Sequence, residues 1–433
     1  MTFASLPAPT CVADWLQAVA GGTDPTAWLE AARERALAGQ PSHAWIHVCP
    51  APDWQAQLAT LAERLQGDRT AQLRRFPLLG VPFAVKDNID IAGQPTTAAC
   101  AAFAHVAERD ATAVRRLLDA GAVWVGKTNL DQFATGLVGT RSPFGRPASV
   151  ADAGRISGGS SSGSAVAVAA GVVPFALGTD TAGSGRVPAG FNGLVGLKPT
   201  PGRASTAGVL PACRTLDCVS VFAHSVGDAA HVLSVIEGPD ADDAYSAWAP
   251  GPAGRAGPWR LGVPVDPRFF GDAGYEAAWS AACERARAAG HTLVPLDFQP
   301  LFDVAALLYQ GPWVAERHVT VRDLLERDPG ALDPTVRQVI EVARRFSATD
   351  AFSAQYRLRE MQARLAALWS GVDALCVPTA PGHPRFSEVD ADPVGVNAAL
   401  GTYTNFVNLL GWCALAVPAG TTASGLPFGV TFI

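Results

Sequence analysis

The chain has 433 residues, of which 48% are hydrophobic and 17% are charged, and its formal net charge is -6. This composition is typical of a globular protein that buries a large core, as one big domain or as two to three smaller ones. The acidic balance argues against nucleic acid as a partner, and with no long apolar run and no secretory signal we expect no membrane span and a cytoplasmic location.

The first part of the chain, residues 10–75, is predicted to be helical. Apolar residues recur at helical spacing from Trp54 to Leu65, and Asp24-Pro25 resembles a cap followed by proline at the first helical position. We therefore expect an N-terminal helical segment over 1–75 and a second unit over 76–433.

From about residue 78, short apolar runs alternate with helical patterns. This alternation is typical of an α/β protein, here with a large central mixed sheet covered by helices on both faces. One helix is predicted at 111–122, and strands are predicted at 80–87, 123–126, 173–178, 194–199, 260–264, 292–296, 374–378 and 426–433.

Two segments interrupt the alternation. Residues 300–370 are mainly helical and are predicted to form a helical insertion on the α/β core, whereas the Pro-, Gly- and Asp-rich stretch 238–258 is predicted to be a surface loop. The sequence stops directly after an apolar run, so we expect a further C-terminal segment to be absent from this chain.

The positions of cysteine, histidine and lysine limit which kinds of active site the chain can form. The eight cysteines are scattered without a C-x-x-C pair and are expected to be buried thiols, and the eight histidines lack metal-ligand spacing. We expect neither a metal nor any other cofactor. Lysine occurs only at 86, 127 and 198, so each lysine merits attention.

The most unusual segment is SGGSSSGSAVAVAAG, residues 157–171. A phosphate cradle is one interpretation, but neither nucleotide-binding glycine pattern is present. A flexible linker is another, but a linker would continue in polar residues, whereas this loop continues into a helix of small apolar residues.

A second glycine-rich loop, GTDTAGSGRVPAGFNG at 178–193, follows the apolar run VPFAL. A strand that ends in such a turn and opens a helix gathers several backbone N–H groups at one point. A serine at that point would have its hydroxyl and an oxyanion hole in the same turn, although Gly-Ser turns are more often only structural.

Lys86 ends the apolar run in VKDNID. Burial among apolar residues could neutralise this amine, and a neutral lysine can act as a base for a serine. An ion pair with Asp87 or Asp90 explains the lysine equally well. The residue alone leaves both interpretations open.

Taken together, VKDNID, GGSSSGS and GTDTAGSGRVPA resemble the amidase-signature family, and VPTAP (377–381) and NLLGWCALAVPAG (408–420) extend the resemblance over about 78–433. The resemblance implies the amidase-signature fold and a catalytic triad of Ser184 as nucleophile, Ser160 as a cis-peptide relay and Lys86 as base. It also implies an oxyanion hole formed by the backbone amides of Thr181, Ala182, Gly183 and Ser184.

Within that family, residues 129–145, 209–223 and 308–317 resemble allophanate hydrolases, which release ammonia from allophanate at the end of ATP-dependent urea degradation. The resemblance implies that Tyr309, Arg317 and Gly136 bind the substrate, and a guanidinium suits a carboxylate. Without it, Arg317 would be taken as a solvated helix charge and Tyr309 as a core aromatic.

The resemblance also carries expectations about partners. It implies a small-molecule substrate, a homodimer, and a functional link to a biotin-dependent urea carboxylase. Allophanate hydrolases commonly carry a C-terminal accessory domain, and we expect that domain to be absent from this chain. The alternatives are another small-amide amidase, such as a biuret hydrolase or the amidotransferase component that supplies ammonia for glutamate-charged tRNA, and a non-catalytic scaffold or nucleotide-binding module.

Overall fold

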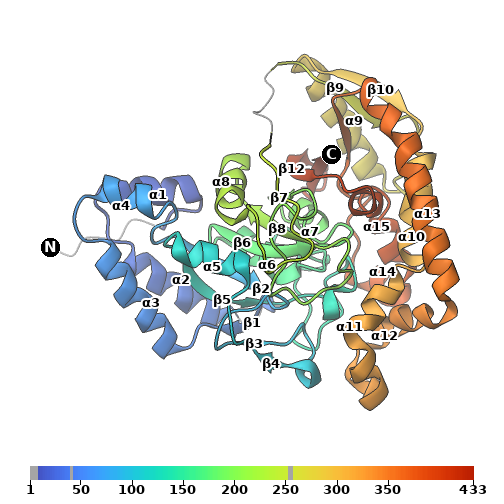
Figure 1. Ribbon diagram of the computed structural model, residues 1–433. Helices are drawn as coiled ribbons and strands as arrows, with labels where there is room; N and C mark the ends of the chain where they lie inside the picture. The colour runs from blue at the N-terminus through green and yellow to red at the C-terminus, as the bar shows by residue number, and fades with distance from the viewer. Residues whose placement is uncertain (1–7, 40–41, 252–256) are drawn as a thin grey trace.

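A computed structural model describes residues 8–39, 42–251 and 257–433. Its centre is an 11-stranded mixed sheet with helices on both faces, which confirms the predicted α/β class (Figure 1). The strands in sheet order are β1 (Trp45–Val48), β5 (Val123–Thr128), β2 (Pro82–Lys86), β6 (Phe175–Asp180), β8 (Cys218–Ala223), β7 (Val195–Lys198), β12 (Ala414–Thr421), β13 (Pro427–Phe432), β11 (Ala374–Pro378), β9 (Arg260–Pro264) and β10 (Thr292–Leu296).

The helices are described in three groups: an N-terminal group, the predicted insertion, and the remaining helices before and after the insertion. An N-terminal group lies at one end of the sheet and the predicted insertion lies at the other, on the right in Figure 1. The N-terminal group is α1 (Val12–Ala20), α2 (Thr26–Ala38), α3 (Ala51–Arg64) and α4 (Arg69–Arg75), and the insertion is α10 (Gln299–Tyr309), α11 (Val314–Arg327), α12 (Pro334–Glu341) and α13 (Ala348–Leu365). The others are α5 (Thr112–Asp119), α6 (Ser162–Ala169), α7 (Val187–Phe191), α8 (Val226–Ile236), α9 (Ala273–Ala288), α14 (Phe386–Ala391), α15 (Gly395–Leu400) and α16 (Asn405–Leu409).

The expected purely helical N-terminal segment is wrong at one place. Trp45–Val48 form β1, which pairs antiparallel with β5 at the edge of the sheet. A strand of only four residues gives too little alternation to be found from sequence. The part of the N-terminal segment at 1–7 and the part of the predicted loop at 252–256 lie outside the described residues.

Strands β2, β5 and β6 position the residues of interest. β2 lies between β5 and β6 and is parallel to both, so the carboxyl ends of all three strands meet at one edge. Phe83 of β2 pairs with Phe175 of β6, and their rings stack 5.6 Å apart. Every residue of the three strands is buried. The polar groups at the strand ends therefore lie at the edge of a buried sheet.

Helix α6 fits this sheet because its residues are small. All but the last of its residues are buried. A Cβ on Gly163 would come within 2.2 Å of the Ala44 carbonyl oxygen and 2.5 Å of the Asn129 amide nitrogen. Glycine at this position therefore lets the helix approach the neighbouring backbone closely.

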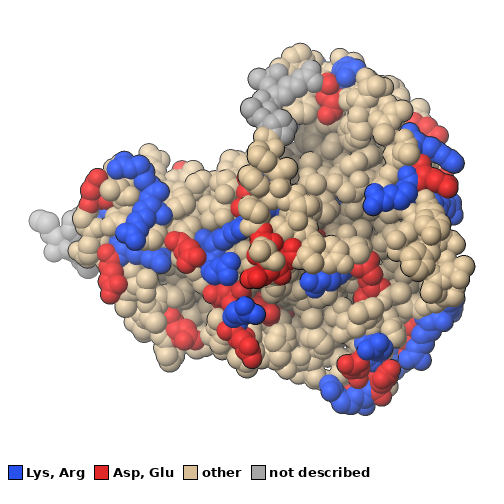
Figure 2. All heavy atoms as spheres, viewed as in Figure 1, with Lys and Arg blue, Asp and Glu red and all other residues tan. Residues whose placement is uncertain are grey.

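The surface carries mixed charge. On the face in Figure 2, basic and acidic side chains are interspersed, without a large field of one sign. This agrees with the modest net charge of -6. Within the described residues, no helix is long and apolar enough to cross a membrane.

Candidate active site

Three chain segments that are far apart in the sequence meet at the shared edge of β2 and β6. Lys86 is the last residue of β2, Ser160 lies in the loop before α6, and Ser184 lies in the turn between β6 and α7. The side chains of all three are at least 97% buried. The structure thus gathers the predicted triad residues at one end of the apolar sheet.

The partners of the Lys86 amine in the described part of the chain are hydroxyl groups. Its Nζ lies 2.8 Å from Ser160 Oγ and 2.8 Å from Thr179 Oγ1. Burial lowers the pKa of Lys86 to about 7, although the charges of Asp131, Asp217 and Asp180 act in the opposite direction. A large share of this amine is therefore neutral near pH 7.

The alternative interpretation of Lys86, an ion pair with a neighbouring aspartate, does not match the geometry. Asp87 pairs with Lys127 at 3.0 Å, and Asp90 lies 3.3 Å from His105. Among the described residues, no carboxylate lies within ion-pair distance of Lys86 Nζ. The acidic residues of VKDNID are thus engaged elsewhere.

The serine-rich loop is a packed element rather than a linker. Ser160, Ser161, Ser162 and Ser164 are all fully buried. The peptide bond between Gly159 and Ser160 is cis, and the Ser160 carbonyl accepts a hydrogen bond from the Asp131 amide at 3.1 Å.

The remaining serines bind backbone. Ser161 Oγ donates to the Thr179 carbonyl at 3.1 Å, and Ser164 Oγ donates to the Leu177 carbonyl at 3.0 Å. Both contacts fasten α6 to β6. Of the loop's hydroxyls, Ser160 is the one that reaches Lys86.

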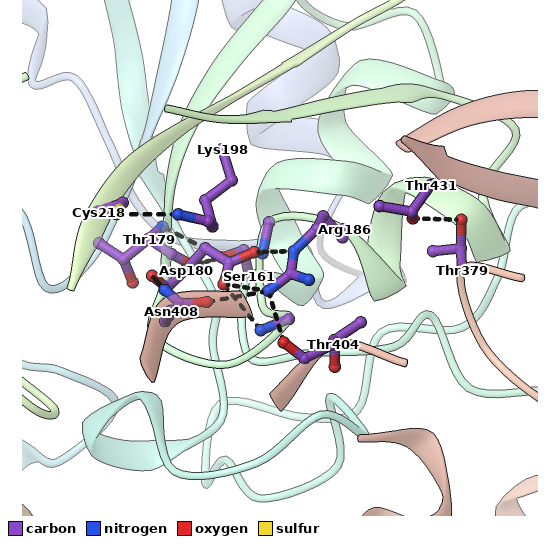
Figure 3. Close-up of polar contacts among 12 residues, drawn as sticks. Ser161, Thr179, Asp180, Arg186, Lys198, Cys218, Thr379, Thr404, Asn408 and Thr431 are labelled. Carbon is purple, nitrogen blue, oxygen red and sulfur yellow. Dashed lines mark hydrogen bonds and ion pairs between the residues drawn. The ribbon is translucent and has the colours of Figure 1, made fainter. Parts of the chain in front are cut away.

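The turn that carries Ser184 is organised by a buried carboxylate (Figure 3). Asp180 accepts hydrogen bonds from the amides of Gly183 and Gly185, at 2.7 and 3.0 Å, and forms an ion pair with Arg186 at 2.8 Å. Burial alone would raise the pKa of Asp180, but Arg186 holds it below its usual range. The amides on both sides of Ser184 are thereby fixed.

A second carboxylate holds the start of the same turn. Asp217 accepts a hydrogen bond from Thr181 Oγ1 and another from the Ala212 amide at 2.8 Å. Burial raises the pKa of Asp217 to about 6, against the effect of these donors. The turn is therefore anchored at Thr181 as well as around Ser184.

The predicted oxyanion donors are not equivalent. The Gly183 amide donates to Asp180, which removes it from the predicted set as a free donor. For the amides of Thr181, Ala182 and Ser184, no acceptor occurs among the described residues. Sequence spacing could not reveal this difference because it depends on where the Asp180 side chain turns.

The predicted substrate-binding residues lie together beside this edge. Arg317, on α11, is 3% exposed; one NH group donates to Thr135 Oγ1 at 3.0 Å and the other to the Tyr309 hydroxyl at 3.4 Å. Gly136 directly follows Thr135, and a Cβ there would meet Asp131 Oδ2 at 2.7 Å. Arg317 is near enough to Lys86 for its charge to help lower the pKa of that lysine.

Arg317 lacks an acidic partner. No carboxylate of the described residues lies in ion-pair range of its guanidinium, and its Nε has no hydrogen-bond acceptor. An isolated buried charge is costly unless a group of opposite charge compensates it. Asp217 and Glu316 lie near enough to act on Arg317 electrostatically, but neither forms an ion pair with it, so the guanidinium is still suited to an anionic group.

Several residues of the site were missed by sequence reasoning: Asp131, Thr179, Asp180, Arg186, Asp217 and Asn408. Asp180 and Arg186 lie within the segment GTDTAGSGRVPA, so a signal was present there. Thr179 lies in the same segment, whereas Asp131, Asp217 and Asn408 come from other parts of the chain, and their roles depend on the fold. Metal binding has no support, because no group of three or more His, Cys, Asp or Glu residues in the described part of the chain could hold an ion.

The chain is similar to known proteins along most of its length. The profile of the family described as Amidase matches residues 28–433. Urea amidolyases of Lachancea kluyveri and Saccharomyces cerevisiae are 48% and 46% identical over 395 and 396 residues; each alignment covers 90% of this chain and 21% of the relative. The chain thus spans about a fifth of the length of these relatives.

Two further proteins extend the comparison. A serine-to-alanine variant of Kluyveromyces lactis allophanate hydrolase superposes with a TM-score of 0.92 at 43% identity, covering 98% of this chain and 69% of that chain. One component of the glutamyl-tRNA(Gln) amidotransferase of Acidobacterium capsulatum is 37% identical over 393 residues, covering 83% of this chain and 82% of the relative.

The ion pair within the nucleophile turn gives a stability prediction. Replacing Arg186 by Met should lower the free energy of unfolding by about 3–5 kcal/mol, because it leaves the Asp180 carboxylate buried without its partner. Arg322→Met is the matched control, since Arg322 pairs with Asp323 on the surface and should cost less than about 1 kcal/mol. Chemical denaturation of both variants measures the difference, and equal losses would contradict the role given to Asp180.

Proposed function

The chain belongs to the Amidase family, and from this premise we propose that it is a serine amidohydrolase that releases ammonia from allophanate. The observation that supports the relay most directly is the 2.8 Å contact between Lys86 Nζ and Ser160 Oγ. No carboxylate of the described residues competes for this amine. The buried Arg317 without an acidic partner supports a substrate that carries a carboxylate.

The proposed relay starts at the neutral amine. Lys86 takes a proton from Ser160, Ser160 takes one from Ser184, and Ser184 Oγ attacks the terminal amide carbon of the substrate. The free amides of Thr181, Ala182 and Ser184 hold the oxyanion that forms. The proton lost by Ser184 ends on Lys86, so the attack leaves neither serine charged.

The second half of the reaction uses the same groups. The leaving nitrogen takes a proton back through Ser160 and departs as ammonia, and an acyl group remains on Ser184. Water activated by the relay then releases the acyl group as a carboxylate. From allophanate the product is an amine carrying two carboxylates, which must still lose CO2.

The substrate assignment rests on Arg317. A planar guanidinium can bind a carboxylate through two parallel hydrogen bonds. Tyr309 and Gly136 complete the proposed pocket, where the tyrosine hydroxyl already contacts the guanidinium. The relatives named urea amidolyase support a substrate derived from urea. We propose that a urea carboxylase supplies the allophanate. The homodimer stays a prediction.

The relay predicts a pH dependence. Below about pH 7 Lys86 carries a proton and has no lone pair to accept another, so kcat/KM should fall as the pH falls through 7 and level off above it. Lys86→Arg should be inactive, because guanidinium does not deprotonate in proteins.

An ammonia-release assay between pH 5.5 and 9 checks this profile, with Ser184→Ala as the blank. A profile that stays flat across this range would rule out a lysine base. Substantial activity in Ser184→Ala would assign the nucleophile elsewhere.

The substrate assignment makes an independent prediction. Arg317→Ala should lose a charge-assisted contact of roughly 1.5–3 kcal/mol, or about 10- to 150-fold in kcat/KM on allophanate and malonamate. Arg317→Lys should restore only part of the loss. Simple aliphatic amides, which lack a carboxylate, should be nearly unaffected when the comparison is made at pH 9, where the influence of Arg317 on the pKa of Lys86 no longer limits the supply of neutral amine.

The same assay includes biuret and glutamine to test the alternative amidases. Equal losses on charged and neutral amides would show that Arg317 supports the fold rather than the substrate. Preference of the wild-type protein for glutamine or biuret would replace allophanate in the proposal.

A further inference from the structure

The segment NLLGWCALAVPAG (408–420) has no part in the proton relay, yet its first residue lies directly against the nucleophile turn. Asn408 is on α16 and is 2% exposed. Figure 3 shows its side chain pointing toward Asp180 and Arg186. The position of Asn408 suggests a function in the geometry of this turn.

Asn408 uses both ends of its amide. Its Nδ2 donates to the Asp180 carbonyl at 2.8 Å and to the Leu216 carbonyl at 3.0 Å. Its Oδ1 accepts from one NH2 group of Arg186 at 3.0 Å. Two donations and one acceptance nearly exhaust what a primary amide can offer.

Two short stretches of backbone, here called strips, make up this region: one runs from Asp180 to Ser184, and the other contains Leu216 and Asp217. Asn408 binds one carbonyl of each strip. Asp180 precedes Thr181 at the start of the nucleophile turn, and Leu216 precedes Asp217, whose carboxylate binds the Thr181 hydroxyl. Asn408 therefore joins the strip that carries the proposed oxyanion donors to the strip that anchors it. In the described structure this side chain contacts both strips and Arg186 together.

The same short helix supports the turn at a second point. Thr404, which directly precedes α16, accepts from the Arg186 guanidinium through its carbonyl at 3.2 Å. A Cβ on Gly183 would come within 2.5 Å of Thr404 Oγ1, and Gly183 has a φ of +135°. The backbone next to Ser184 is thus pressed against this helix, with no room for a side chain.

We propose that Asn408 is a positioning residue, which fixes the Ser184 hydroxyl and the amides of Thr181 and Ala182 at the distance that attack on an amide requires. It contacts neither substrate nor the reacting atoms, so it acts through the turn. This inference rests on the proposed function, because it assumes that Ser184 is the nucleophile.

The test compares two amide side chains that each bridge backbone groups. Asn408→Ala removes the hydrogen bonds that join the turn to Leu216 and Arg186. Gln57→Ala is the matched control, since the Gln57 amide binds both the carbonyl and the amide of Trp124, away from the turn. Asn408→Asp keeps the size and an acceptor for Arg186 but loses the amide donors. Should Asn408→Ala fail to fold, this second variant carries the comparison.

Four quantities are measured for each variant: the midpoint of chemical denaturation, kcat and KM for ammonia release, and the rate at which a phosphonofluoridate probe modifies Ser184. For both Asn408 variants we expect kcat and the probe rate to fall on the order of 10- to 100-fold, as misplaced donors and nucleophiles do, with KM changed less than about threefold. Gln57→Ala should lose stability without a loss in kcat.

The outcomes separate the inference from the proposed function. Asn408 variants that lose stability but keep kcat and the probe rate would overturn the positioning role. If the wild-type protein reacts with the probe but cleaves no amide of the panel, the substrate assignment falls and the probe rates still decide the role of Asn408. If wild-type Ser184 does not react at all and releases no ammonia, both proposals are contradicted.

Discussion

The burial of one lysine amine at the end of an apolar sheet constrains the rest of this site. Lys86 is the last residue of β2, and its amine lies between two hydroxyl groups. No carboxylate of the described residues lies within ion-pair range of it. Desolvation favours the neutral amine, which is the form that can accept a proton. Because the unfolded amine binds its proton more tightly, this burial costs stability below about pH 7, and the cost shrinks as the pH rises toward the ordinary lysine value of 10.5.

The surroundings of Lys86 answer this constraint by directing every nearby acid elsewhere. Asp87 is paired with Lys127, and Asp180 is paired with Arg186. Asp217 accepts from the Thr181 hydroxyl, and Asp131 accepts from the backbone amides of Gly139 and Arg141. Each pairing also fixes a piece of backbone, so the same contacts that keep carboxylates away from Lys86 hold the nucleophile turn. Arg317 is the exception, a buried cation without an ion pair among the described residues, and its open guanidinium points toward an anionic substrate.

Much of this arrangement was accessible from the sequence, because local patterns carry it. Strands β9, β10 and β11 begin and end at the predicted residues. Lys86 stands out at the end of an apolar run and Ser160 and Ser184 stand out in glycine-rich loops, and the family resemblance supplies their roles. Strand β1 was missed because four residues give little periodicity. The roles of Asp217 and Asn408 could not be predicted, since they reach the turn from segments 33 and 224 residues beyond Ser184, and no local pattern records such contacts.

The central claim is that Lys86 is neutral in the working protein, and its titration can be observed directly. The chain contains three lysines, so labelling lysine Cε with 13C gives three NMR signals, and the Lys86→Met variant assigns one of them. The account predicts that the Lys86 signal titrates with a midpoint near pH 7 in the folded protein. A Lys86 signal that keeps the shift of a charged ammonium up to pH 9 would contradict it.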